Sequence, residues 1–431
     1  MLIFGFSLLF SCGAVKRTNK HISDLLESAP VFSQSFAGLA VFDPVEHKML
    51  YVKNADNYFT PASNTKLLTY YTGLMLLGDS VPGLKYFTAR DSLIFKGTGD
   101  PSLLNPNLSN SGILQFLKNR REKLFYSPPS YQEAHFGPGW SWDDYNSYYS
   151  VERTAFPIYG NSVRFIQPSA SLLPKTIPAY FQNNLSADSL STKSSKRVTR
   201  NLIANTFSAQ SIARDTSFQQ EVPFKYSSEL FVELLSDTLH KEIEIIKKVP
   251  KSFAPARTFF SIPSDSLYKK MLTDSDNFIA EQILLLASDK LSDTLKTSIA
   301  IEYMQDHFLK DLPDKPIWVD GSGLSRYNLC TPRSLVKVLE KIKDKVPYEK
   351  LFTFLPVGGK TGTLKHYFSA DKPYVFAKTG SLSNNYSLSG FLKTKSGKIL
   401  IFSFMNSNYT VPSSKLKREM ERILKMIRET Y

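Results

Sequence analysis

The segment Ser63-Asn64-Thr65-Lys66 could supply a nucleophile and its base. It opens a run of apolar residues at helical spacing, and side chains three positions apart lie on one side of a helix. A serine hydroxyl is a weak nucleophile that needs an adjacent base, which a desolvated lysine can provide. The helix N-terminus would also stabilise a developing oxyanion. Because Ser-x-x-Lys is short, a serine N-cap followed by a solvated lysine fits the same residues.

A second polar group, Ser275-Asp276-Asn277, comes directly before another run with helical spacing. The Ser275 hydroxyl could relay a proton to a leaving amine. The Asn277 amide could hold a substrate carbonyl. The alternative is a cluster of N-cap residues, since Ser, Asp and Asn are the favoured caps.

A third group, Lys378-Thr379-Gly380-Ser381, follows the apolar run 374–377, which predicts a strand. The lysine and threonine side chains could bind a substrate carboxylate. Gly380 would let a substrate backbone lie against the strand edge, because glycine has no side chain there. The N–H groups of Ser381 and Ser63 could together form an oxyanion hole.

A second Lys-Thr-Gly sequence begins at Lys360 and competes with the first. It follows Val357-Gly358-Gly359, which is a poor strand, whereas Lys378 follows a clean apolar strand and precedes a hairpin. Because this chemistry needs an edge strand, we predict that Lys378 belongs to the site and that Lys360 does not.

The elements that must position these groups form one antiparallel sheet covered by helices. Alternating apolar residues within 36–53 and 386–406 predict two β-hairpins. Helical spacing predicts helices at 18–29, 64–77, 264–291, 332–344 and 413–430. The last is basic and amphipathic, and we expect it to pack on the sheet.

The length of the chain predicts more than one domain. Between residues 85 and 260, short strand-like pieces alternate with turns, and 185–199 is expected to be an exposed loop. We therefore predict a catalytic domain of 18–84 plus 261–431 and a mostly-β insertion over 85–260, with a third domain possible at about 165–240.

The amino-acid composition limits the classes of protein and of partner to be considered. With 42% hydrophobic and 21% charged residues, the chain is typical of soluble globular proteins. Its net charge of +14 is compatible with an anionic partner such as a wall polymer, although we favour a simply solvated basic surface. No Arg-rich run accompanies the charge, so nucleic acid is not expected. Two Cys and six scattered His predict neither a metal nor another cofactor.

Residues 1–17 read as a targeting segment and tail. The apolar run 2–10 suits the core of a signal peptide and is too short to span a bilayer. Leu9-Phe10-Ser11-Cys12 resembles the lipobox of bacterial lipoproteins, in which the Cys is acylated. We expect an exported, periplasmic protein, with a lipid anchor on Cys12 as a further expectation that palmitate labelling of Cys12→Ala would test. An incidental Cys in an N-terminal tail is the alternative.

Ser-x-x-Lys, Ser-x-Asn and Lys-Thr-Gly, in this order, are the signature of penicillin-binding proteins and serine β-lactamases. Over roughly residues 30–410 the chain resembles the low-molecular-mass class C penicillin-binding proteins, the D-alanyl-D-alanine carboxypeptidase/endopeptidase family. Further segments with this resemblance are Gly99-Asp100-Pro101, Gly139–Asp144, Asp320–Asn328 and Lys378–Phe391. The long interval between Ser63 and Ser275 resembles the family's inserted domains, which single-domain β-lactamases lack.

The resemblance implies an α+β fold with an antiparallel sheet flanked by helices and large, mostly-β inserted domains. It implies that Ser63 is acylated by peptidoglycan stem peptides and by β-lactams, with Lys66 as base and with Ser275 and Lys378 passing a proton to the leaving group. It also implies that Asp143 or Asp144 meets the free amine of a diamino acid; a carboxylate that caps a turn is the alternative.

Two other functions remain open on the sequence. A serine β-lactamase would need a group that deacylates penicillin quickly, and no Glu-bearing loop of that kind is visible. A non-catalytic wall-binding lipoprotein on the same scaffold would have no need of three intact motifs.

Overall fold

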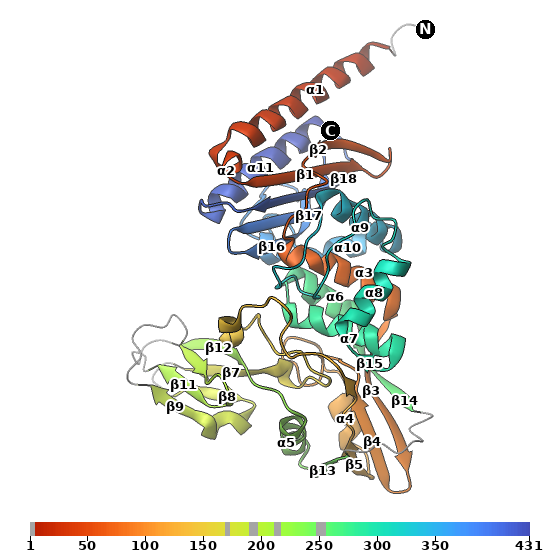
Figure 1. Cartoon of the computed structure of the whole chain (residues 1–431), viewed down its shortest axis with the longest axis vertical. Coiled ribbons are helices and arrows are strands. Elements are labelled where there is room, and N and C mark those ends of the chain that lie inside the picture. Colours follow the sequence, from red (N-terminus) through yellow and green to blue (C-terminus); the bar gives the residue numbers. More distant parts are fainter. Residues whose placement is uncertain (1–4, 169–172, 189–196, 211–216, 247–255) are drawn as a thin grey trace. The chain divides into compact units, whose positions relative to one another are not determined.

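The computed structural model describes residues 5–168, 173–188, 197–210, 217–246 and 256–431 (Figure 1). The chain packs into two compact units. The first unit consists of Met1–Leu74, Tyr268–Asp276 and Ile301–Tyr431, and the second of Met75–Leu267 and Asn277–Ala300. The segment 277–300 thus groups with the inserted part of the chain. The predicted domain division itself stays a prediction. No described helix has the length and apolar character needed to cross a membrane.

The first unit is built on a five-stranded antiparallel sheet with the strand order β16-β17-β18-β1-β2. Its strands are β1 (Phe36–Asp43), β2 (Lys48–Lys53), β16 (Val375–Leu382), β17 (Asn385–Lys393) and β18 (Ile399–Ser407). Both predicted hairpins are therefore confirmed. The N-terminal hairpin joins the C-terminal strands through the pairing of β1 with β18. Strand β16 lies at one end of the order.

Side chains along β16 alternate between the two faces of the sheet. Val375 and Ala377 belong to the core cluster that the sheet shares with buried residues of the C-terminal helix. Because successive side chains of a strand point to opposite faces, Phe376, Lys378 and Gly380 lie on the other face.

Helices cover both faces of this sheet (Figure 1). The helices of the first unit are α1 (Gly5–Ser28), α2 (Pro30–Ser33), α9 (Pro332–Lys345), α10 (Tyr348–Phe354) and α11 (Ser413–Thr430). Ile22 and Leu26 of α1 and Leu416 and Met420 of α11 are buried in the core cluster on one face. Helix α9 contacts β18 and β1. The predictions of α9 and α11 are confirmed, and α1 begins earlier than predicted.

Three helices cross or adjoin the division between the units: α3 (Lys66–Leu76), α6 (Ser264–Thr273) and α8 (Thr297–His307). The second unit contains α4 (Ile113–Lys118), α5 (Ser228–Leu239) and α7 (Asn277–Ser292). The region 264–291, predicted as helical, is thus two helices separated by the three residues 274–276.

The strands of the second unit form separate small sheets. A five-stranded sheet has the order β13-β5-β4-β3-β14, two three-stranded sheets have the orders β12-β7-β8 and β10-β11-β9, and β15 pairs with β6. The bounds are β3 (Ser80–Ala89), β4 (Ser92–Gly97), β5 (Lys123–Tyr126), β6 (Ser130–Tyr131), β7 (Ser162–Gln167), β8 (Lys175–Ile177), β9 (Leu185–Asp188), β10 (Val198–Arg200), β11 (Phe207–Gln210), β12 (Phe218–Pro223), β13 (Ile243–Ile245), β14 (Arg257–Pro263) and β15 (Thr294–Leu295).

The prediction of an exposed loop at 185–199 is wrong at both ends of that segment. Strand β9 lies at its start and strand β10 at its end, and both strands pair with β11. The Ser- and Lys-rich composition there concealed short strands whose apolar residues, Leu185 and Val198, are buried in the core of the unit. Residues 189–196 lie outside the described part of the chain.

A buried aspartate organises the Gly99-Asp100-Pro101 turn. The Asp100 carboxylate accepts hydrogen bonds from the backbone N–H of Ser102 at 2.9 Å and from the Ser102 hydroxyl at 2.7 Å. Gly99 has φ 94°, and a Cβ there would approach Leu285 and Leu295 at 3.2 Å. The turn is thus fitted closely against α7. Burial raises the pKa of Asp100 to about 6 despite these hydrogen bonds.

Replacing Asp100 with asparagine is expected to stabilise the protein above neutral pH. A folded-state pKa above the unfolded value means that wild-type stability is fully present below about pH 4 and is lost as the pH rises through 6. An uncharged amide avoids this loss, which amounts to about 3 kcal/mol. Urea unfolding of both proteins at pH 4.5 and pH 8 measures it. Equal destabilisation of Asp100→Asn at both values would mean that the carboxylate hydrogen bonds outweigh the buried charge.

Candidate active site

The Ser63 turn differs locally from the predicted helix start. Ser63 lies in a 3₁₀ turn, η1 (Ala62–Thr65), and α3 begins only at Lys66. The Lys66 side chain is fully buried, and its Nζ donates to the Ser63 hydroxyl at 2.9 Å. It also donates to the backbone carbonyl of Ser322 at 2.6 Å. The tighter turn still brings Ser63 and Lys66 into hydrogen-bond contact, as their three-residue spacing predicted.

A second lysine–serine pair lies in the same unit. Lys378 is fully buried, and its Nζ donates to the Ser275 hydroxyl at 2.8 Å and to the Thr379 carbonyl at 2.8 Å. Burial lowers the pKa of Lys378 well below its usual value, and the positive charge of Lys66 lowers it further. Ser275 has φ 62°, an unusual backbone conformation for a residue with a side chain. Such conformations are concentrated at functional sites.

Two contacts join the pairs through the backbone. The Asn64 side-chain N–H donates to the carbonyl of Lys378 at 3.0 Å and to that of Ser387 at 3.4 Å. A Cβ at Gly380 would lie 2.4 Å from the Pro61 carbonyl oxygen and 2.9 Å from the Ser63 nitrogen. Strand β16 therefore lies directly against the Ser63 turn. Gly380 is required for this close approach, a reason that the sequence did not reveal.

The strand that carries the third motif is longer than predicted. The motif Lys378–Ser381 lies inside β16 and not after it, because it pairs with β17 along its whole length. On the outer side, the Ala377 nitrogen donates to the Pro356 carbonyl at 3.0 Å and the Gly358 nitrogen to that of Val375 at 2.9 Å. No strand among the described residues pairs with the outer edge beyond this point.

The remaining residues of the third motif have different surroundings. The Thr379 hydroxyl is buried and donates to the Thr363 hydroxyl at 2.7 Å, whereas Ser381 is exposed. Lys360, at the start of the competing Lys-Thr-Gly sequence, is exposed in a turn. Its surroundings lack the burial that distinguishes Lys378.

Three predicted residues belong to the second unit. Asn277 is the first residue of α7, and its side-chain N–H donates to the Tyr149 carbonyl at 2.9 Å. Asp144 lies in η2 (Trp142–Asn146) and accepts a hydrogen bond from the Tyr149 hydroxyl at 2.7 Å. Asp143, in the same turn, is exposed. Within the second unit, Asn277 is thus linked to Asp144 through Tyr149. The side chain of Cys12 lies outside the described residues.

Sequence reasoning gave no role to several residues around the two pairs. Asn64 and Thr363 are the partners of Lys378 and Thr379 described above, and the Ser322 carbonyl is a partner of Lys66. Asn64 is within the first motif, and Ser322 is within the Asp320–Asn328 run, so a signal was present for both. Thr363 carried none, because its contact with β16 depends on the fold.

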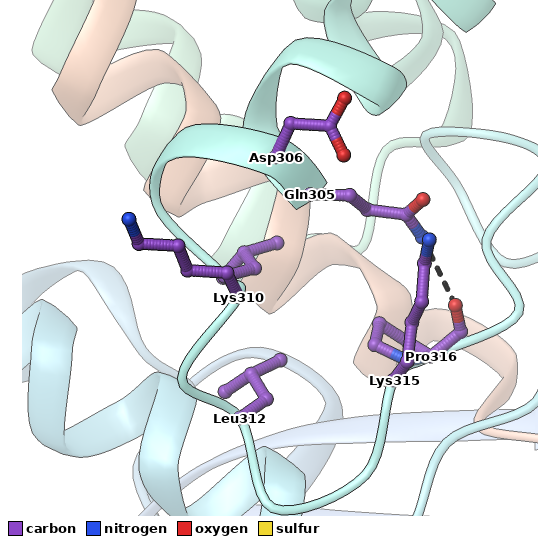
Figure 2. A pocket seen from close by; sticks show the side chains of 7 residues that line it. Gln305, Asp306, Lys310, Leu312, Lys315 and Pro316 are labelled. Atoms are coloured by element: carbon purple, nitrogen blue, oxygen red, sulfur yellow. Dashed lines mark hydrogen bonds between the residues drawn. The ribbon is translucent and has the colours of Figure 1, made fainter.

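A pocket of about 260 Å³ lies beside α8 in the first unit (Figure 2). The residues that line it are Gln305, Asp306, Leu309, Lys310, Leu312, Lys315 and Pro316. The Gln305 side chain donates across it to the Pro316 carbonyl at 3.0 Å. None of the predicted site residues lines this pocket, so we do not connect it with the chemistry of the motifs.

Comparison with known proteins gives consistent results. The model of the D-Ala-D-Ala carboxypeptidase 3 (S13) family matches residues 18–429. D-alanyl-D-alanine carboxypeptidase DacB of Haemophilus influenzae is 24% identical, over 96% of this chain and 93% of its own length. Penicillin-sensitive carboxypeptidase A of Dictyostelium discoideum is 26% identical, over 85% of this chain and 81% of its own.

The crystal structure of penicillin binding protein 4 (dacB) from Haemophilus influenzae has a TM-score of 0.74 and 21% identity, with 94% of this chain and 98% of that chain covered. This similarity confirms the predicted α+β fold, a helix-flanked antiparallel sheet with additional β-sheets. The match of the family model over almost the whole sequence decides the identity. The chain belongs to the D-Ala-D-Ala carboxypeptidase 3 (S13) family and is a serine-type D-Ala-D-Ala carboxypeptidase.

Proposed function

We propose that this chain cleaves the terminal D-Ala-D-Ala bond of peptidoglycan stem peptides through an acyl-enzyme on Ser63. The observation that carries the proposal is the presence of two buried lysines in one unit, each donating to a serine hydroxyl. The distances are 2.9 Å for Lys66 and Ser63 and 2.8 Å for Lys378 and Ser275. One pair can activate a nucleophile while the other protonates a leaving group.

Acylation begins when the Ser63 oxygen attacks the carbonyl carbon of the penultimate D-Ala. The hydroxyl proton passes to Lys66, whose nitrogen is already within hydrogen-bond distance. The N–H groups of Ser63 and Ser381 stabilise the negative charge that develops on the carbonyl oxygen. Because Gly380 lets β16 approach the Ser63 turn, these two N–H groups belong to adjoining segments.

The C–N bond then breaks, and the leaving amine needs a proton. Ser275 gives its hydroxyl proton to this nitrogen and takes one from Lys378. The lowered pKa of Lys378 makes its protonated form a stronger acid than an ordinary lysine. The proton that Lys66 accepted restores the one that Lys378 gave up. Water then hydrolyses the ester and releases the shortened stem peptide.

The same residues provide for substrate binding. The charge of Lys378 and the hydroxyls of Thr379 and Ser381 bind the terminal carboxylate. The substrate backbone adds to the unpaired outer edge of β16. The Asn277 amide holds the penultimate carbonyl. Asp143 or Asp144 binds the free amine of a diamino acid in the stem peptide.

An endopeptidase reaction follows from the same chemistry when the leaving amine belongs to the side chain of a second stem peptide. β-Lactams resemble the D-Ala-D-Ala end, and we propose that they acylate Ser63 and deacylate slowly. The relatives' names, with penicillin sensitivity in one and penicillin binding in another, support this part of the proposal.

Digestion of purified muropeptides tests the proposal. We expect mass spectrometry to show pentapeptides shortened by one D-Ala, and prior treatment with benzylpenicillin to prevent this. A serine β-lactamase would instead turn over penicillin rapidly. A wall-binding protein would leave the muropeptides unchanged, which would overturn the proposal.

The cellular location remains a proposal too. A substrate in the cell wall requires export, which the apolar run 2–10 supports. Acylation of Cys12, and through it an association with the membrane, stays a prediction.

A further inference from the structure

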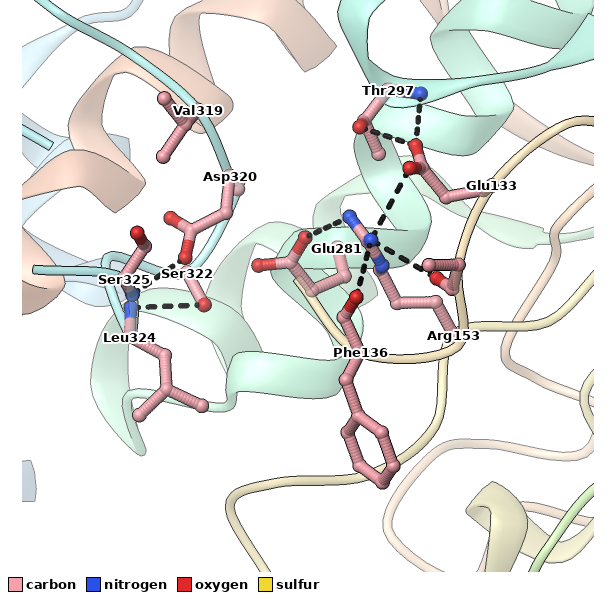
Figure 3. Close-up of polar contacts among 12 residues, drawn as sticks. Glu133, Phe136, Arg153, Glu281, Thr297, Val319, Asp320, Ser322, Leu324 and Ser325 are labelled. Atoms are coloured by element: carbon pink, nitrogen blue, oxygen red, sulfur yellow. Dashed lines mark hydrogen bonds and ion pairs between the residues drawn. The ribbon is translucent and has the colours of Figure 1, made fainter. Parts of the chain in front are cut away.

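The segment 320–328 folds around the carboxylate of Asp320 (Figure 3). One oxygen of this carboxylate accepts from the Gly323 nitrogen at 2.8 Å and from the Asn328 side chain at 2.8 Å. The other oxygen accepts from the Ser325 nitrogen at 2.7 Å. Asp320, Ser325 and Asn328 are all buried. A single side chain thus fixes the path of the loop backbone.

The fixed loop directs two carbonyl groups at helix α3. The Gly321 carbonyl accepts from the Thr69 hydroxyl at 2.6 Å, and the Ser322 carbonyl accepts from the Lys66 Nζ at 2.6 Å. Gly323 has φ 79°, and a Cβ there would lie 1.8 Å from the Ala62 carbonyl oxygen. The loop is therefore packed directly against the turn that carries Ser63. Neither its shape nor its closeness to Lys66 is accounted for by the proposed reaction steps.

We propose that Asp320 is a positioning residue that aims the Lys66 nitrogen at Ser63 through the Ser322 carbonyl. This inference rests on the proposed role of Lys66 as base. A neutral amine has two N–H groups and one lone pair, and only the lone pair can accept the Ser63 proton. A carbonyl oxygen can only accept, so it holds an N–H of Lys66 to itself. The lone pair can then face the Ser63 oxygen, 2.9 Å from the Lys66 nitrogen, as that hydroxyl gives up its proton.

Replacement of Asp320 with asparagine tests the inference. An amide accepts hydrogen bonds with one oxygen only, so its N–H₂ group meets either the Gly323 or the Ser325 nitrogen, which are both donors. The loop then relaxes and releases Lys66. We expect the rate of acylation by a fluorescent penicillin to fall about 10- to 100-fold, while the Kd of the preceding non-covalent complex stays unchanged.

A double-mutant comparison distinguishes positioning from a general structural effect. If Asp320 acts through Lys66, then adding Asp320→Asn to Lys66→Ala will not slow the residual acylation further. A further fall of 10-fold or more in that background would overturn the inference. Asn328→Ala removes one partner of Asp320 and is expected to give a smaller loss of the same kind. It serves as the second variant if Asp320→Asn does not fold.

Asp100→Asn provides the matched control, because Asp100 is also buried and also holds a turn through a backbone N–H. This control should acylate like the wild type. If the wild type itself is not acylated, the proposed function fails. If the wild type is acylated and Asp320→Asn matches it in both Lys66 backgrounds, the inference alone fails.

Discussion

Replacing Ser63 with alanine will abolish both the release of D-Ala from pentapeptides and the covalent labelling by fluorescent penicillin. The alanine side chain has no atom that can form the ester, and the Ser275 hydroxyl is hydrogen-bonded to a different lysine. A loss of more than about 10³-fold in the rate is expected, since the removal of a nucleophile costs this much or more in serine hydrolases. Mass spectrometry of muropeptides and gel fluorescence measure the two losses.

A control variant and an unfolding measurement show whether the loss comes from the missing nucleophile. Ser292→Ala alters an exposed serine at the end of α7 and should behave like the wild type in both assays. The Ser63 side chain lies in a short turn and is half-buried, so its loss should leave thermal unfolding almost unchanged. Full labelling of Ser63→Ala would contradict the assignment of the nucleophile.

The sequence predicted which residues meet at Ser63 better than it predicted the geometry of their contacts. Ser63 and Lys66 are three residues apart, so a local rule about helix faces was enough to pair them. Even there, the turn is a 3₁₀ turn before the helix and not its first α-helical turn. Strand alternation likewise predicted both hairpins of the antiparallel sheet, although β17 and β18 are buried on both faces because helices cover both sides.

What the sequence could not predict depends on contacts between distant segments. Lys378 lies inside β16 because it pairs opposite Ser389 of β17, a pairing that no local pattern reveals. Asn64 meets the Lys378 carbonyl only once the Ser63 turn has packed on the sheet. The Asp320–Asn328 run was visible as a motif, but its meaning required the position of Lys66. Each of these contacts is a product of the fold.

The two Lys-Thr-Gly sequences give a matched pair of variants, Lys378→Met and Lys360→Met. Methionine keeps most of the volume of lysine and removes its amine. Because Lys378 is buried on Ser275 and Lys360 is exposed, we expect the first variant to lose about 10²-fold or more in acylation rate and the second to remain within about 2-fold of the wild type.

Unfolding measurements on the same variants show whether the loss is chemical. Burial and the charge of Lys66 lower the pKa of Lys378 in the folded protein. A proton on this buried amine therefore lowers the free energy of unfolding of the wild type. The unfolded chain then binds more protons than the native state, so wild-type stability rises with pH toward the ordinary pKa of lysine. Lys378→Met should therefore unfold at a temperature equal to or above that of the wild type at pH 7, with the difference shrinking by pH 9.

An inactive Lys378→Met that unfolds well below the wild type would mean that the amine holds the fold together. An inactive Lys360→Met beside an active Lys378→Met would reverse the choice between the two sequences. A gain in stability with a loss of acylation is the result expected of a buried cation that is retained for its chemistry.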